Sequence, residues 1–281
     1  MKTTLTFRAA VLSLFIFVMF IGVWHLATLA PKESAATQAA NAEYAELMGK
    51  GAEKASGFPS PEKVGSAFVK YLSDPFYDNG PNDKGIGIQV GYSLLRVGTG
   101  FLLAMLFALP LGFVIGMSPL MTRALNPFIQ ILKPISPLAW MPLALYTLKD
   151  SEVSGIFVIF ICSLWPMLIN TAFGVAGVRR DWINVARTLE VNPLRKAFLV
   201  ILPAAAPTIL TGMRISMGIA WIVIVAAEML VGGTGIGYFV WNEWNNLALP
   251  NVIFAITMIG LVGMALDLGF GTLQKFVTYR E

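Results

Sequence analysis

The sequence is poor in the residues that build disulfides, metal sites and water-facing surfaces. It holds one cysteine and one histidine in 281 residues, and charged residues make up 13% of the chain. A single cysteine excludes an intrachain disulfide, and one histidine without further thiols excludes a zinc site of the usual kind. Soluble domains are about one quarter charged. The low charge therefore excludes an ordinary soluble domain.

Apolar residues dominate what is present. The hydrophobic fraction is 56% and the mean hydropathy is +0.70. At about 20 residues for each membrane crossing, the chain has room for roughly six spans. The long apolar segments cover about 7–30, 93–117, 129–148, 153–178, 204–231 and 252–276. We therefore predict an all-α integral membrane protein with about six transmembrane helices. The modest net charge of +4 does not indicate nucleic-acid binding.

The lone cysteine and the lone histidine both favour structural roles. Cys162 lies inside an apolar run, where it is predicted to be a small buried hydrophobe. His25 follows Trp24 near the end of the first apolar segment, a placement typical of the membrane interface. No Ser-His-Asp set or pair of carboxylates is available for catalysis. We therefore predict no catalytic residue and no metal ligand.

The first apolar segment has two interpretations. Lys2 and Arg8 flank its start, and "ATLAP" follows it, which resembles a cleaved signal peptide. The segment is nevertheless long enough to span a membrane, and no small-x-small cleavage pattern follows Ala30. A retained anchor is the favoured interpretation, with a signal peptide as its alternative.

Residues 31–88 differ in kind from the rest of the chain. Six lysines and eight acidic residues give this segment a net charge of −2. An amphipathic helix is expected to start near Ser60 and to end at Asp74, with Val64, Phe68 and Leu72 on one face. The chain is thus predicted to comprise a membrane helix (1–30), an insert (31–88) and a five-span core (89–281).

The loop charges predict the orientation in the membrane. Five cations and two acids lie in 179–196, and Arg123, Lys275 and Arg280 occupy the loop at 118–126 and the C-terminal tail. The loops at 149–152 and 232–250 are acidic in balance. By the positive-inside rule, both termini and the cationic loop are cytoplasmic, and the 31–88 insert is periplasmic.

The cationic loop is expected to form two short helices. Asp181 is predicted to cap a helix over 182–190, and Pro193 is predicted to open a second one. The first helix would present an apolar face made of Trp182, Val185, Ala186 and Leu189. Such a face suits a lipid surface or a groove on a partner protein, and the residues alone leave both open.

This loop resembles the cytoplasmic signature loop of binding-protein-dependent ABC importers, written E-A-A-x3-G-x9-I-x-L-P. Ala186, Leu202 and Pro203 match it, Val200 is a conservative change, and Asn184, Val185 and Glu190 depart from it. "SLLRVGTGFLLAMLFALPLGFVIGMSP" and "VGGTGIGYFVWNEWNNL" are similar to the branch that moves nitrate, bicarbonate, taurine and alkanesulfonates, and most similar to its nitrate permeases.

The resemblance implies a type I ABC importer permease fold with a cytoplasmic coupling helix in the bacterial inner membrane. It implies a second permease copy in a homodimer, two ATP-binding subunits that hold ATP and Mg, and a periplasmic substrate-binding protein. No cofactor is expected in this chain, which is not itself an enzyme. The ATPase-coupling residues would be Asp181, Trp182, Asn184, Val185, Ala186, Leu189, Glu190, Leu202 and Pro203.

The residues themselves also argue against ATP hydrolysis by this chain. No G-x-x-x-x-G-K-[ST] phosphate loop occurs in it. "GGTGIG" at 232–237 is rich in glycine, but no lysine follows it, and it is predicted to be a turn between spans.

Five ionisable side chains fall within the predicted spans, where charge is costly and functional. Arg96 is the candidate anion contact, with half of an ion pair as the alternative, and Glu228 is expected to be a hydrogen-bonded support or gate. Arg214 and Asp267 are predicted to form a structural pair, with an anion site as the alternative. Lys133 lies in a span whose hydrogen bonding is predicted to be broken by prolines at 134, 137 and 142. Such an irregular span is predicted to line the path, where Trp140, Met141 and Tyr146 would gate it.

The predicted function is import of nitrate, with nitrite, driven by ATP. Bicarbonate is the first alternative, and alkanesulfonate or taurine is the second. From another class, a secondary transporter driven by an ion gradient would show inverted repeats or a chain of acidic relays, and neither is evident. A mere membrane anchor would not need spans interrupted by proline and glycine.

Overall fold

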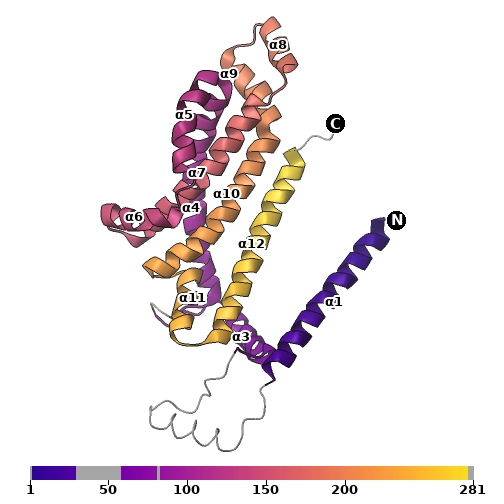
Figure 1. Ribbon diagram of the computed structural model, residues 1–281, viewed down its shortest axis with the longest axis vertical. Coiled ribbons are helices and arrows are strands. Elements are labelled where there is room, and N and C mark those ends of the chain that lie inside the picture. Colours follow the sequence, from indigo (N-terminus) through magenta and orange to yellow (C-terminus); the bar gives the residue numbers. More distant parts are fainter. Residues whose placement is uncertain (1, 30–57, 81–82, 278–281) are drawn as a thin grey trace, which may run out of the picture. The chain divides into compact units, whose positions relative to one another are not determined.

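The computed structural model describes residues 2–29, 58–80 and 83–277. Within these ranges the secondary structure is helical, apart from one isolated bridge between Asp78 and Lys84. Five helical segments are long and apolar enough to cross a membrane (Figure 1). They are Leu5–Thr28 of α1 (Lys2–Thr28), α4 (Ile86–Met117), α7 (Ser151–Ala176), the segment Pro193–Val231 that ends in α10 (Leu202–Val231), and α12 (Leu249–Val277). The all-α, multi-pass prediction is confirmed.

The chain divides into two compact units, one made of Met1–Asp74 and Glu243–Phe254, the other of Pro75–Asn242 and Ala255–Glu281. The division predicted at residues 30 and 88 concerned membrane topology and stays a prediction. Residues 30–57 of the predicted insert lie outside the described part of the chain.

In the first unit, α3 (Pro61–Ser73) starts and stops where the sequence predicts, with Ser60 before it and Asp74 after it. Its buried face was predicted wrongly in part, because Leu72 is 50% exposed and Tyr71 is buried instead. Two steps of four residues overshoot the 3.6-residue turn, so Leu72 drifts off the face that Val64 begins. The Tyr71 ring stacks on Phe254 with centroids 5.2 Å apart.

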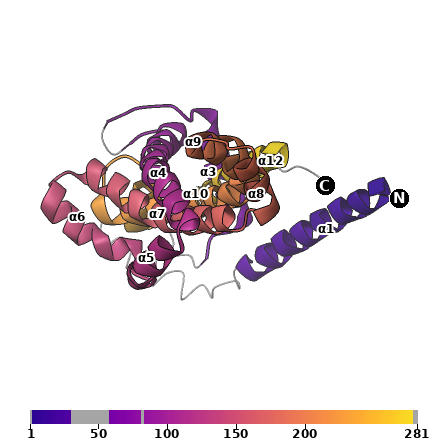
Figure 2. The same cartoon turned by 90° about the horizontal axis from the view of Figure 1, so that it is seen from above.

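In the second unit, α7 packs against α4 on one side and α10 on the other (Figure 2). Glycines make these close approaches possible, as small residues do in membrane bundles. A Cβ on Gly112 of α4 would lie 2.7 Å from the Thr171 side chain, and a Cβ on Gly212 of α10 would lie 2.5 Å from that of Asn170. Helices α4, α7 and α10 therefore form the core of this unit.

The span predicted over 129–148 is broken at its prolines, as the sequence indicates, but it begins earlier than predicted. Helix α5 already begins at Pro119, inside the predicted loop, and ends at Leu132. A bend of 83° then separates it from η1 (Pro137–Trp140) and α6 (Met141–Leu148), so the two pieces make a sixth span only if counted together. Pro134 and Pro137 lack the N–H groups that would continue the helix, which accounts for the break.

The connection predicted as a loop over 232–250 contains a further helix, α11 (Ile236–Asn245). Ile236, Phe239 and Val240 recur at helical spacing and are buried. This periodicity overrides the glycine-rich start of the segment.

Just before α4, Asp78 accepts hydrogen bonds from two nearby residues, Gly80 and Lys84. Lys84 Nζ donates to Asp78 Oδ2 at 3.0 Å, and the Gly80 N–H donates to Asp78 Oδ1 at 3.1 Å. These two hydrogen bonds, that from Lys84 first, lower the pKa of the Asp78 carboxyl below its ordinary value.

Candidate functional site

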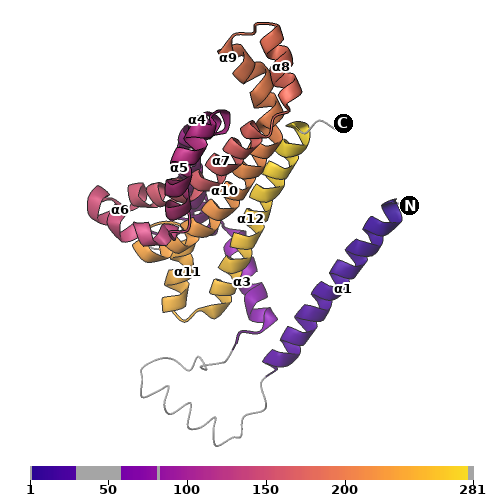
Figure 3. The same ribbon diagram turned by 45° about the horizontal axis from the view of Figure 1, so that its top comes forward.

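The cationic loop folds into a helical segment that projects beyond the ends of α7 and α10 (Figures 1 and 3). It consists of α8 (Arg180–Thr188), α9 (Pro193–Lys196) and a π-helical stretch η2 (Ala197–Ile201) that runs into α10. The second predicted helix is confirmed at Pro193, where Asn192 Oδ1 accepts from the Leu194 N–H at 3.1 Å.

The predicted start of the first helix is wrong by two residues. Arg179 occupies the N-cap position without a side-chain cap, and Asp181 lies in the first turn. A carboxylate there still opposes the positive end of the helix dipole. Asp181 Oδ2 also lies 3.6 Å from Arg179 Nη2, and both of these side chains are exposed.

The end of α8 shows how this chain manages without the signature glycine. Glu190 has a left-handed backbone with φ of 51°. Its N–H donates to the Arg187 carbonyl and the Val191 N–H donates to the Ala186 carbonyl, both at 3.0 Å. This is the Schellman arrangement that usually has glycine at the left-handed position. The turn is therefore retained, with a glutamate in a conformation that suits glycine.

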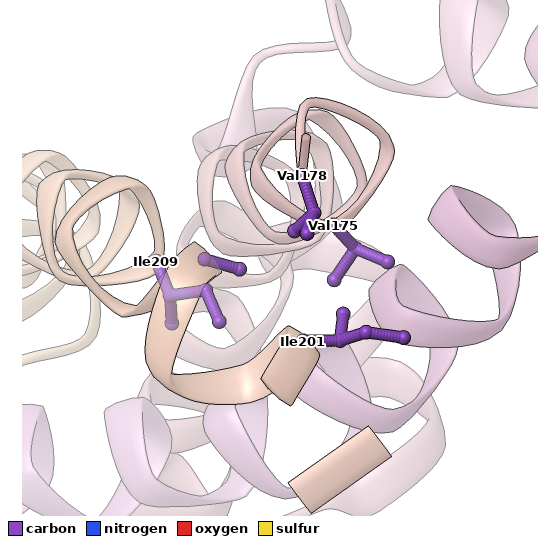
Figure 4. Close-up of a cluster of buried hydrophobic side chains, with 5 residues drawn as sticks. Val175, Val178, Ile201 and Ile209 are labelled. Carbon is purple, nitrogen blue, oxygen red and sulfur yellow. The ribbon is translucent and has the colours of Figure 1, made fainter. Parts of the chain in front are cut away.

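A cluster of buried apolar side chains anchors the projecting segment (Figure 4). It joins Val175 of α7, and Val178 just after this helix, to Ile201 of η2 and Ile209 of α10. Ile183 of α8 packs against this cluster. Movement of α8 is thus connected directly to two of the three core helices.

The predicted apolar face of α8 is split by the structure. Ala186 is only 4% exposed and lies inside the chain, out of reach of a partner. Trp182, Val185 and Leu189 are exposed, Leu189 by 70%. The apolar part of the exposed α8 surface therefore consists of these three side chains.

A buried polar network occupies the opposite end of the core helices. Glu228, near the end of α10, is 4% exposed. Ser93 Oγ and Arg96 Nη1 of α4 lie 2.8 Å from its carboxylate oxygens, and the Gly237 N–H donates to it at 3.0 Å. A buried carboxylate is tolerated where its charge and its lone pairs are satisfied in this way.

The turn after α10 is bound into the same network. Gln89 Oε1 accepts from the Gly235 N–H at 2.6 Å, and Ser93 Oγ accepts from the Ile236 N–H at 3.0 Å. A Cβ on Gly235 would overlap the Glu228 carboxylate, so any other residue there would displace this carboxylate from its partners. The glycine-rich turn predicted for "GGTGIG" therefore binds a carboxylate of this chain, that of Glu228, through the Gly237 N–H.

Sequence reasoning missed Gln89, Ser93 and Glu152 in this network. Gln89, Ser93 and Arg96 follow one another at steps of four and three residues in an otherwise apolar helix. That spacing places polar groups on one face and would have been the signal. Glu152 carried no such signal, because it lies in the first turn of α7, where an acid is ordinary.

Arg96 is an ion-pair partner in this structure. Its Nη1 lies 2.8 Å from Glu228 Oε1, and its Nη2 lies 3.0 Å from Glu152 Oε1. The cavity that it lines with Met141 and Glu228 measures about 10 Å³, about enough for one water. An anion contact would require Arg96 to leave both carboxylates, so that role stays a prediction.

The other predicted path residues lie apart from this network. Lys133 is exposed at the break after α5. Trp140 is partly buried, and its indole N–H has no hydrogen-bond partner among the described residues. Tyr146 is exposed on α6. Neither Lys133 nor Trp140 lines the cavity at Arg96.

Arg214 and Asp267 do lie together. Arg214 Nε and Nη2 donate to the two Asp267 oxygens at 2.6 and 2.5 Å. Their side chains are 39% and 54% exposed, in contrast to the buried Arg96 pair. The contact forms, and the structural role assigned to it stays a prediction.

Residues 108–280 match the family described as the binding-protein-dependent transport system inner membrane component. The chain belongs to this family. The match contains α7, the projecting segment, α10 and α12, whereas Gln89, Ser93 and Arg96 precede it. As an inner membrane component, the chain is the permease subunit of an ABC transporter, and ATP hydrolysis lies in separate subunits.

Individual relatives agree with this assignment. The permease is 44% identical to the nitrate import permease protein NrtB of Synechocystis sp. over 80% of this chain and 82% of that one. It is 43% identical to the bicarbonate transport system permease protein CmpB of the same organism, over 73% and 74%. The taurine transport system permease protein TauC of Escherichia coli is 34% identical over 66% and 68%.

A solved structure supports the fold. The inward-facing MetNI methionine ABC transporter superposes with a TM-score of 0.59 at 14% identity. The alignment covers 68% of this chain and 95% of that one. The predicted ABC permease fold is confirmed.

Proposed function

We propose that this permease carries nitrate, with nitrite, inward across the bacterial inner membrane. The observation that carries the proposal is the 44% identity to a nitrate import permease over 80% of the chain. The bicarbonate permease aligns at nearly the same identity over a shorter part of the chain, 73%, which makes bicarbonate the second candidate.

The proposed assembly contains two copies of this chain, two ATP-binding subunits that hold ATP and Mg, and a periplasmic substrate-binding protein. Support for a second copy and surrounding lipid comes from exposed apolar side chains on α12, among them Leu261, Met264 and Leu268. Both termini are proposed to be cytoplasmic, because the cations are concentrated in α8, α9 and the C-terminal tail.

The proposed coupling mechanism uses α8 as a lever. The ATP-binding subunit would contact Trp182, Val185 and Leu189, which are exposed. Closure of that subunit on ATP would displace α8, and Ile183 would pass the displacement to the cluster that joins α7 and α10. Packed cores respond to such displacements by repacking as units, so α7 and α10 would move together.

At the other end of the same helices, the Arg96–Glu228 network would hold the pathway closed. It links α4, α7 and α10 through Arg96, whose partners Glu152 and Glu228 lie on the other two helices. Separating the helices would break two ion pairs and strand a buried charge. Binding of the loaded substrate-binding protein at this end would supply the compensating contacts.

The substrate assignment can be tested with the reconstituted complex. ATPase activity would be measured with binding protein loaded with nitrate, with bicarbonate or with neither. We expect nitrate-loaded binding protein to stimulate hydrolysis above the other two. Stimulation by bicarbonate alone would overturn the nitrate proposal and favour the second candidate.

The coupling role can be tested separately by Leu189→Asp. We expect uptake and substrate-stimulated ATPase activity to fall to background while the chain still inserts and keeps its melting temperature, because Leu189 is exposed. Phe276→Asp is the matched control, since Phe276 is an exposed apolar residue outside α8. Wild-type uptake by Leu189→Asp would remove α8 from the coupling mechanism.

A further inference from the structure

A pocket of about 560 Å³ opens between α10 and the C-terminal half of α12. This is within the range of small-ligand sites, about 300–1,000 Å³. Its charged and polar lining consists of Arg214, Asp267, Thr272, Gln274 and Lys275. The pocket therefore contains charged and polar side chains, although both helices that form it are apolar enough to span a membrane.

The pocket contains donors that have no acceptor. Arg214 uses Nε and Nη2 on Asp267, which leaves Nη1 without a partner among the described residues. Lys275 Nζ likewise has no hydrogen bond or ion pair within the described part of the chain. Among the described residues that line the pocket, Asp267 is the single acid, so their net charge is +1.

The surroundings keep the Arg214 guanidinium accessible and oriented. The bidentate contact to Asp267 fixes its plane. On the α12 side, Gly271 presents no side chain, and even a Cβ there would lie 3.6 Å from the guanidinium. An oriented guanidinium edge beside a mobile ammonium is a donor set that suits an oxyanion.

We propose that this pocket binds an oxyanion through Arg214 Nη1 and Lys275 Nζ, with Asp267 as the residue that positions Arg214. The proposed function identifies the anion as nitrate, and the inference rests on that function for this identity only. A lipid phosphate offers the same chemistry, because cationic pockets between membrane helices also receive lipid headgroups.

The position of the pocket suggests what the site does. Arg214 is 12 residues into α10, about 18 Å from its first residue. Lys275 lies in the last turn of α12, at the end that points toward the same side as α8 and α9 (Figures 1 and 3). The pocket thus lies toward the side of the membrane where α8 and α9 are proposed to contact the ATP-binding subunits. An anion bound there would be leaving the transport pathway on that side or re-entering it from that side. The Arg96 network lies at the other end of α10, so the two sites are distinct.

The test uses the permease–ATPase complex without binding protein in nanodiscs of zwitterionic lipid, titrated with sodium nitrate by calorimetry. We expect the wild type to bind nitrate, Lys275→Gln to weaken binding about tenfold or more, and Lys275→Arg to restore it. The double variant Arg214→Gln/Asp267→Asn removes both charges of the pair together and should abolish binding. Lys133→Gln, an exposed lysine outside the pocket, is the control and should bind like the wild type.

A second set of nanodiscs containing phosphatidylglycerol distinguishes the two sources of oxyanion. If lipid is the occupant, native mass spectrometry should show anionic lipid retained by the wild type and lost from Lys275→Gln, with a flat nitrate titration. The proposal would be overturned if the wild type and both pocket variants bound nitrate equally and retained lipid equally. It would also be overturned if a structure of the complex showed side chains of the second permease copy occupying the pocket. Failure of the nitrate function is seen separately, in the ATPase assay with loaded binding protein.

Discussion

The two ends of α10 are stabilised in opposite ways. At its end near Val231, the carboxylate of Glu228 is buried and held by directional hydrogen bonds from α4 and from the following turn. At its start, Ile201 and Ile209 pack in an apolar cluster, and α8 adds an exposed apolar surface outside it. One end is thus complete within this chain, whereas the other offers a surface that fits a partner.

The two ends of α10 are therefore expected to differ in how far they can move. Directional bonds to a buried charge hold one geometry, and any departure from it leaves groups unsatisfied. Apolar packing has no preferred direction, so the members of the cluster can repack together into a second arrangement. Over the 30 residues of α10, about 45 Å, a shift imposed at the apolar end can therefore work against a fixed polar end.

The largest effect on stability is expected from Glu228→Ala. The change leaves the buried Arg96 with Glu152 as its one carboxylate partner among the described residues, beside the Thr234 carbonyl, and removes the acceptor of the Gly237 N–H. We expect the free energy of unfolding to fall by about 3–5 kcal/mol. Denaturant-dependent loss of helical circular dichroism in detergent would measure it.

Two controls sharpen this prediction. Glu152→Ala removes a 62% exposed side chain from the same arginine, and Asp181→Ala removes an exposed contact at the α8 end. Each should cost no more than about 1 kcal/mol. A loss from either control as large as that from Glu228→Ala would show that burial does not distinguish the two ends.

A smaller effect is expected from Gly235→Ala. The added methyl group overlaps the Glu228 carboxylate, so either the turn or the carboxylate must leave its position in the network. We expect a loss of about 1–3 kcal/mol, again measured by denaturation. Gly98→Ala is the control, because nothing lies within 4 Å of that added methyl group. A neutral Gly235→Ala would mean that the turn is not held against the carboxylate.

The smallest effect, and one of opposite sign, is expected from Glu190→Gly at the coupling end. Glycine adopts the left-handed φ of 51° without steric strain, so the melting temperature should rise by the equivalent of about 1 kcal/mol. Leu189→Gly, one residue earlier at an ordinary φ of −82°, should lower it instead. If both variants changed the melting temperature by the same amount, the strained backbone at Glu190 would not be the cause.

Several features could be predicted from the sequence because they depend on local chemistry. Apolar segments of about 20 residues identified the spans, and the prolines of the third one indicated its break. Ser60, Asp74 and Pro193 marked helix ends that the structure confirms, because caps and prolines act on their own neighbours. The signature residues Ala186, Leu202 and Pro203 identified the family to which the chain belongs.

The tertiary structure decided what depends on contacts between distant residues. Arg96 and Glu228 are 132 positions apart, and no local pattern states that one neutralises the other. Ala186 and Leu189 both fit an apolar helix face, but only packing against the rest of the chain buries one and exposes the other. The sequence by itself determined a membrane permease with a coupling loop, since solvent and local propensity act residue by residue. Which charges are paired, and which remain open to an anion, was decided by how the helices pack.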